Sequence, residues 1–162
     1  MSARRPRVLA VSSSGGHWIE LRRLAPAFEG FETVWCSTMP GFAAEVGTDR
    51  FVLIPDGNRW NKLRLAWVAL RVLVVLLRVR PDVVVSTGAA PGYFAVRFAR
   101  VLRCASVWVD SIANAEELSL SGQRSLRFAS LTLTQWPELG APLPEDLSRR
   151  SPSTAYFAGA VV

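Results

Sequence analysis

The feature that most constrains this chain is the alternation of short β-branched runs with helical stretches. The clearest run, Asp82–Ser86, reads DVVVS and is continuous in β-branched residues, as expected for a strand buried on both faces. Similar strands are predicted at Arg7–Val11, Phe31–Cys36, Phe51–Pro55, Ala105–Val109, Leu131–Thr134 and Thr154–Ala158. Helices are predicted between them at His17–Phe28, Trp60–Val79, Tyr93–Leu102 and Ser121–Phe128. This alternation predicts an open, mostly parallel sheet with helices on both faces.

Length and composition indicate one folded unit with an anionic partner. We expect residues 1–162 to form a single domain, since 50% of them are hydrophobic and can fill a core. The net charge is +6, and Lys62 is the only lysine, so the positive charge is almost entirely arginine. Arginine suits planar contact with phosphate or carboxylate. A GC-rich genome would give the same excess of arginine over lysine. The arginines are scattered and no RNA- or DNA-binding motif is present, so no nucleic-acid partner is predicted.

Cysteine and histidine are too scarce for most metal sites. Cys36 and Cys104 lie far apart, and His17 is the only histidine, so neither a disulfide framework nor a metal site is predicted. The apolar run Val8–Val11 after the first arginines is too short for a secretory leader. We therefore expect a cytoplasmic location and no bound metal or other cofactor.

The loop after the first predicted strand is the first candidate site. Ligands of such sheets bind beyond the carboxyl ends of the strands, where the sequence SSSGGH lies. The backbone amides of Ser14, Gly15 and Gly16 at a helix start suit a phosphate or diphosphate. The helix start also disfavours a cationic imidazolium, and a neutral His17 can act as a general base. Alternatively, the glycines only make a tight turn that His17 caps.

Further candidates follow other strands at the same edge. In Ser86–Gly92, the Thr87 hydroxyl and the Gly88 amide are possible phosphate donors, or the loop is merely a turn of small residues. Asp110 ends the fifth strand, where a carboxylate often binds a sugar or takes part in catalysis. It could equally cap the next segment together with Ser111.

The predicted helix Trp60–Val79 carries more apolar surface than one core face needs. Arg71 interrupts it, so it falls short of the roughly 20 apolar residues of a spanning helix. Arginine recurs at every seventh position and forms one stripe beside the apolar residues. This pattern predicts contact with a membrane interface, unless the second apolar face meets a partner chain. The residues expected at the membrane are Trp60, Arg64, Trp67, Arg71, Val74 and Arg78.

Several motifs together resemble a known family. They are Ser14–His17, Val109–Ser111, Leu118–Gly122, Thr134–Leu139 and Tyr156–Gly159. Over Val8–Val162 they are similar to the asparagine-linked-glycosylation fourteen family. That family includes the acceptor-binding, membrane-recruiting subunit of the two-chain enzyme that adds the second N-acetylglucosamine to dolichol diphosphate. Its bacterial relatives are the first chains of paired capsule and exopolysaccharide glycosyltransferases.

The resemblance implies a Rossmann-like domain, the N-terminal, acceptor-side half of a GT-B glycosyltransferase. A partner chain would bind most of the UDP-sugar, and the acceptor would be a polyprenyl-diphosphate-linked sugar at the inner face of the cell membrane. The sugar transferred would be N-acetylglucosamine or another hexose, with no metal required. His17 would be the base, with Asp110 second, and the amides of Ser14–Gly16 would face the acceptor diphosphate. The alternative is a non-catalytic scaffold that recruits a separate glycosyltransferase to the membrane.

Overall fold

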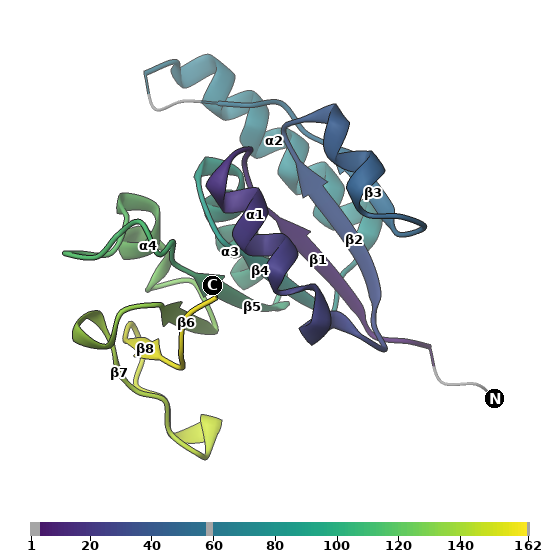
Figure 1. Cartoon of the computed structure of the whole chain (residues 1–162). Helices are drawn as coiled ribbons and strands as arrows, with labels where there is room; N and C mark the ends of the chain where they lie inside the picture. Colours follow the sequence, from purple (N-terminus) through teal and green to yellow (C-terminus); the bar gives the residue numbers. More distant parts are fainter. Residues whose placement is uncertain (1–3, 58–59, 162) are drawn as a thin grey trace.

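A computed structural model describes residues 4–57 and 60–161 of the chain (Figure 1). The strands are β1 (Arg7–Val11), β2 (Glu32–Ser37), β3 (Arg50–Leu53), β4 (Val83–Ser86), β5 (Ala105–Val109), β6 (Leu131–Thr134), β7 (Ala141–Pro142) and β8 (Ala155–Phe157). The α-helices are α1 (Gly16–Arg23), α2 (Lys62–Val79), α3 (Ala90–Val101) and α4 (Leu120–Ser125). Short 3₁₀ segments lie in the connections: η1 (Ala25–Phe28), η2 (Pro40–Glu45), η3 (Pro137–Leu139) and η4 (Leu147–Arg149).

The strands form one parallel sheet in the order β3-β2-β1-β4-β5-β6-β8-β7. The chain winds outward from β1 through β2 to β3, and then in the opposite direction from β4 through β5 to β6. The winding therefore reverses between β1 and β4, which pair with Leu9 beside Val84. Such a reversal leaves a crevice at the carboxyl ends of the two strands.

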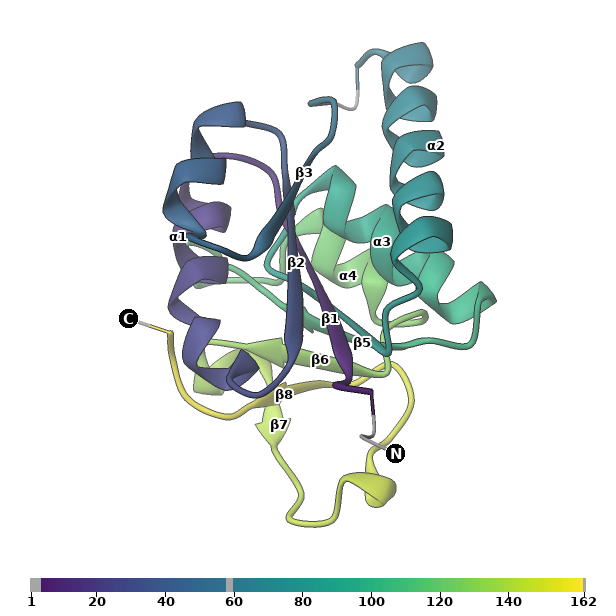
Figure 2. The ribbon, with the colours of Figure 1, turned by 90° about the vertical axis from the view of Figure 1, so that its right-hand side faces the viewer.

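Both faces of the sheet are covered by helices, as the sequence predicted. Figure 2 shows α1 on one face and α2, α3 and α4 on the other. Because successive strand residues point to opposite faces, Leu9 and Val11 of β1 pack on the α2 and α3 side, whereas Val8 and Ala10 pack on the α1 side. All four are buried, which explains the unbroken apolar run of this strand.

Three stretches differ most from the sequence prediction, while the helix predicted over Ser121–Phe128 is shorter and spans Leu120–Ser125. The helix predicted over His17–Phe28 ends at Arg23 and continues as η1, which contains Pro26; proline lacks the N–H that an α-helix would need there. Helix α3 begins at Ala90, three residues before the predicted start, because Pro91 fits a first turn. The linker-like stretch Ala141–Pro152 contains β7 and η4, which the sequence did not predict.

Candidate functional site

The loops after β1 and β4 meet at the crevice. The Thr87 hydroxyl donates a hydrogen bond to the carbonyl oxygen of His17 (2.6 Å), and the Ser13 amide donates to the carbonyl oxygen of Gly88 (3.3 Å). The Gly88 amide donates in turn to the Ser86 hydroxyl (3.2 Å). The structure thus brings Thr87 and Gly88 against His17. The Thr87 hydroxyl and the Gly88 amide, which were predicted to donate to a phosphate, therefore donate hydrogen bonds to other groups of the protein.

The His17 ring occupies the space that a side chain at Gly88 would need. Its φ of +138° lies in a region that L side chains rarely adopt, and a Cβ there would lie 2.5 Å from Nδ1 of His17. The His17 side chain is 30% exposed, but Nδ1 itself is buried. Nε2 is not among the buried atoms that lack a partner, and no described residue forms a hydrogen bond with it, so it is the ring nitrogen that can reach a substrate in the crevice.

The start of α1 is open on the side of the first loop. Gly15 has a φ of +73°, and a Cβ at Gly15 or Gly16 would meet nothing within 4 Å. No described side chain caps this helix, and first-turn amides have no acceptor inside a helix. The Ser14 amide, by contrast, donates to the Thr38 hydroxyl (3.1 Å). Of the amides predicted to face a diphosphate, those of Gly15 and Gly16 remain accessible to a ligand.

Glu20 is a buried carboxylate at this site that the sequence analysis missed. It lies one turn after His17 on α1 and is only 5% exposed. Its Oε1 accepts hydrogen bonds from the Ser111 hydroxyl (3.0 Å), the Ile112 amide (2.8 Å) and the Gln135 side-chain amide (3.3 Å). The i, i+3 spacing from His17 and its place between two apolar residues were the available signals.

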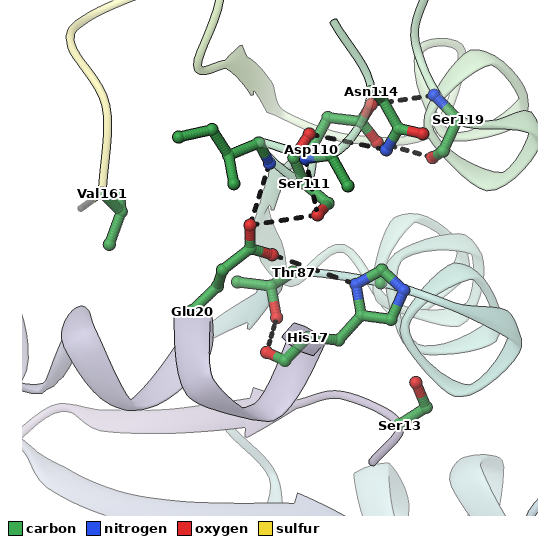
Figure 3. Close-up of polar contacts among 12 residues, drawn as sticks. Ser13, His17, Glu20, Thr87, Asp110, Ser111, Asn114, Ser119 and Val161 are labelled. Atoms are coloured by element: carbon green, nitrogen blue, oxygen red, sulfur yellow. Dashed lines mark hydrogen bonds and ion pairs between the residues drawn. The ribbon is translucent and has the colours of Figure 1, made fainter. Parts of the chain in front are cut away.

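Asp110 is also buried, 2% exposed, but it is bonded on both oxygens. Its Oδ1 accepts from the Trp108 indole (3.0 Å) and the Ser119 hydroxyl (2.6 Å), and its Oδ2 accepts from the Ser119 amide (2.8 Å). Ser119 in turn caps α4 by accepting from the Gly122 amide (2.9 Å). Figure 3 shows Asp110 turned toward Ser119 and Glu20 toward His17. Asp110 therefore joins β5 to α4.

The Gln-Trp motif after β6 holds the loop that contacts Glu20. The Gln135 side chain donates to the Asp110 carbonyl oxygen (3.0 Å) and accepts from the Val161 amide (2.7 Å). The Trp136 indole donates to the Ile112 carbonyl oxygen (2.8 Å). The loops after β1, β4, β5 and β6 thus meet at one edge, as the parallel topology predicted.

Helix α2 has two apolar faces. Its core face contains Val68, Val72, Val75, Leu76 and Val79. Its outer face exposes Leu63 (86%), Trp67 (52%), Leu70 (50%) and Leu77 (51%), and Trp60 (81%) precedes the helix. Figure 2 shows the first turns of α2 extending beyond the sheet. The structure therefore leaves a large apolar surface uncovered, of which the sequence analysis had identified the tryptophans.

The predicted arginine stripe borders this outer face. Arg71, Val74 and Arg78 line the seam between α2 and the edge strand β3. Arg64 donates from Nε to the Asp56 carbonyl oxygen (2.7 Å), and the Arg71 guanidinium lies 5.9 Å from the Trp67 ring centre. None of the helices within 4–57 and 60–161 is both long and apolar enough to cross a membrane. The same ranges contain no group of three or more His, Cys, Asp or Glu side chains arranged to hold a metal ion.

Solved structures match this fold, although no family model and no curated protein matches the sequence. MurG from Acinetobacter baumannii superposes with a TM-score of 0.68 and 13% identity, over 94% of this chain and 45% of MurG. UDP-GlcNAc 2-epimerase from Neisseria meningitidis, in a structure with bound UDP-GlcNAc, superposes with a TM-score of 0.67 and 14% identity. The match covers 96% of this chain and 47% of the epimerase. A glycosyltransferase from Rickettsia africae superposes with a TM-score of 0.63 and 11% identity, over 97% of this chain and 43% of the glycosyltransferase.

The architecture is one Rossmann-like half of a GT-B fold. The chain spans less than half the length of each of these structures. At such identities the likeness establishes the fold alone. The chemistry must be argued from the residues at the crevice.

Proposed function

We propose that this chain is the acceptor-side subunit of a UDP-sugar-dependent glycosyltransferase. The observation that carries the proposal is His17, which has an accessible Nε2 at the crevice of a half GT-B fold. The resemblance to the asparagine-linked-glycosylation fourteen family supports a polyprenyl-diphosphate-linked sugar as the acceptor. A partner chain would supply most of the donor site.

The reaction follows from the position of His17. A hydroxyl of the acceptor sugar attacks the anomeric carbon of the UDP-sugar. The new carbon–oxygen bond forms while the bond between that carbon and the β-phosphate oxygen breaks, and UDP leaves with the bonding electrons. The hydroxyl proton passes to Nε2 of His17. The acceptor diphosphate lies against the amides of Gly15 and Gly16, where the helix start favours an anion.

His17 is the better candidate base of the two that the sequence offered. Both oxygens of Asp110 already accept hydrogen bonds, and the group is inaccessible to a substrate hydroxyl. His17 keeps one accessible nitrogen without a protein partner in the described structure. A general base must reach the proton that it removes, and only His17 meets this condition.

The decisive test is transfer of labelled sugar from a panel of UDP-sugars to a bacterial lipid extract. The chain is assayed alone, with a co-expressed candidate partner, and against the partner alone. We expect transfer only by the pair. Transfer by the partner alone, unchanged by this chain, would overturn the proposal.

The base assignment is tested with His17→Gln in the same complex. We expect a loss of about 10²- to 10⁴-fold in rate, the usual contribution of a general base. Copurification with the partner should be unchanged, because the side chain lies at the crevice and not in the core. A fully active variant complex would contradict the assignment.

A second candidate function, recruitment of a catalytic partner to the membrane, is favoured by the outer face of α2. Exposed tryptophan and leucine beside arginine suit the surface of an anionic bilayer. We expect the chain to float with vesicles that contain phosphatidylglycerol and the double variant Leu70→Glu/Leu77→Glu to lose this binding. Val101→Glu is the matched control, since Val101 is an exposed apolar residue (74%) on α3. Equal binding by all three proteins would exclude α2 as the contact.

If the chain is only a scaffold, the double variant abolishes transfer on membranes and His17→Gln leaves transfer unchanged. If it is a catalytic subunit, His17→Gln abolishes transfer even to a short, soluble acceptor. The two functions are therefore separated by the same pair of variants.

A further inference from the structure

Two buried polar atoms at the crevice face each other without a hydrogen-bond partner. They are Nδ1 of His17 and Oε2 of Glu20, 4.0 Å apart on successive turns of α1 (Figure 3). A buried polar atom is costly unless it is paired, and here a nitrogen that can donate lies near an oxygen that can accept. This arrangement indicates that the two side chains act together.

The remaining contacts of both side chains fix their orientation. Three donors from Ser111, Ile112 and Gln135 hold Oε1 of Glu20, which leaves Oε2 as the oxygen directed at the imidazole. The absence of a side chain at Gly88 makes room for the ring, which packs closely against its backbone. A small side-chain rotation would close the 4.0 Å separation. Catalytic hydrogen bonds are often long before substrate binds.

We propose that Glu20 is a positioning residue that accepts a hydrogen bond from Nδ1–H of His17. This bond holds the imidazole in the tautomer whose Nε2 lone pair faces the crevice. The inference rests on the proposed function of His17 as base. When Nε2 takes the proton of the acceptor hydroxyl, the Glu20 carboxylate stabilises the imidazolium that forms.

Glu20→Gln gives a sharp test because the surrounding donors dictate how the new amide lies. The Ile112 amide and the Ser111 hydroxyl require an oxygen at the position of Oε1. The NH₂ group must then take the position of Oε2 and donate to Nδ1 of His17. The variant therefore inverts the tautomer: the proton moves to Nε2, and the lone pair at the crevice is lost.

The readout is the imidazole ¹⁵N spectrum of the full chain labelled at histidine. His17 is the only histidine, so the spectrum reports one ring. We expect Nδ1–H in the wild type and in the control Glu29→Gln, whose side chain is exposed on the surface, and Nε2–H in Glu20→Gln. Nε2–H in the wild type, or the same tautomer in all three proteins, would overturn the proposal. The wild-type spectrum decides even if Glu20→Gln fails to fold.

Activity of the complex gives an independent readout. We expect Glu20→Gln to lower kcat by up to about 10⁴-fold with little change in KM, as the equivalent change does in serine-protease triads. An inverted tautomer in Glu20→Gln, together with no sugar transfer by the wild-type complex, would refute the proposed function and leave the positioning role intact. An active complex with an unchanged tautomer would refute the positioning role alone.

Discussion

The two buried carboxylates of the crevice, Glu20 and Asp110, differ in what their second oxygen does. Both oxygens of Asp110 accept hydrogen bonds from its own neighbourhood, the indole of Trp108 and the start of α4. Glu20 has one oxygen held by three donors, and the other is unpaired and faces His17.

The difference separates a structural carboxylate from one that is available for chemistry. A buried carboxylate whose two oxygens both accept hydrogen bonds from the protein stabilises the fold and has no free acceptor for a ligand. One with a single unpaired oxygen beside a histidine is able to orient that histidine. Burial alone therefore does not identify the functional carboxylate. The hydrogen-bond partners of each of its oxygens identify it.

The largest effect should come from removing the Asp110 carboxylate. Asp110→Ala leaves the Trp108 indole and both Ser119 donors without an acceptor, so we expect the free energy of unfolding to fall by about 3–5 kcal/mol. Urea unfolding followed by tryptophan fluorescence measures it, with the exposed Glu116→Ala as control. A variant of unchanged stability that has lost all transfer would break the comparison and assign the chemistry to Asp110.

A smaller effect is expected at the glycine that supports the imidazole. Gly88→Ala places a Cβ 2.5 Å from Nδ1 of His17 at a φ of +138°, which should cost about 1–3 kcal/mol of stability and displace the ring. The ¹⁵N resonances of His17 should shift, whereas Gly41→Ala, with open space around it, should leave them unchanged. Unmoved resonances in Gly88→Ala would show that the ring is not held in this way.

The smallest effect concerns an exposed carboxylate, Asp82, at the opposite edge of the sheet. The Arg7 amide (2.6 Å) and then the Arg4 guanidinium (2.8 Å) hold the pKa of Asp82 below its ordinary value. A lowered pKa in the folded state means that the stabilisation is complete above the unfolded pKa, about 3.9, and is lost as the pH falls through the folded pKa.

Asp82→Asn should therefore be less stable than the wild type at pH 7 and at pH 5, and the difference should shrink below about pH 4. Urea unfolding of both proteins at pH 7, 5 and 3 measures it. An equally large difference at pH 3 would mean that Asp82 acts through something other than its charge.

The sheet could be predicted closely because its strands are buried on both faces. Unbroken apolar runs mark β1 and β4, and the run at β5 is interrupted only by Ser106, so the positions of these strands follow from the local sequence. The short strand β7 was missed because Ala141 and Pro142 have no strand-like pattern, and only pairing with β8 makes them a strand. Long-range pairing overrides local preference there.

The site was only half predictable. His17 was found because a glycine loop before a helix is a local pattern. Glu20 was missed because an acid on a short helix is usually solvated, and its partners Ser111, Ile112 and Gln135 follow it by more than 90 residues. Asp110 was named from its place at a strand end, but the hydrogen bonds that occupy it became visible only in the structure.

The sequence by itself determined the parallel α/β architecture and the edge where a ligand would bind, because hydrophobic periodicity is a local property and strands that alternate with helices pair in parallel. Only the tertiary structure decided which polar groups at that edge are free. Whether Thr87, Asp110 or Glu20 keeps an open donor or acceptor depends on partners brought from distant segments, since a buried polar group bonds to whatever the fold places beside it.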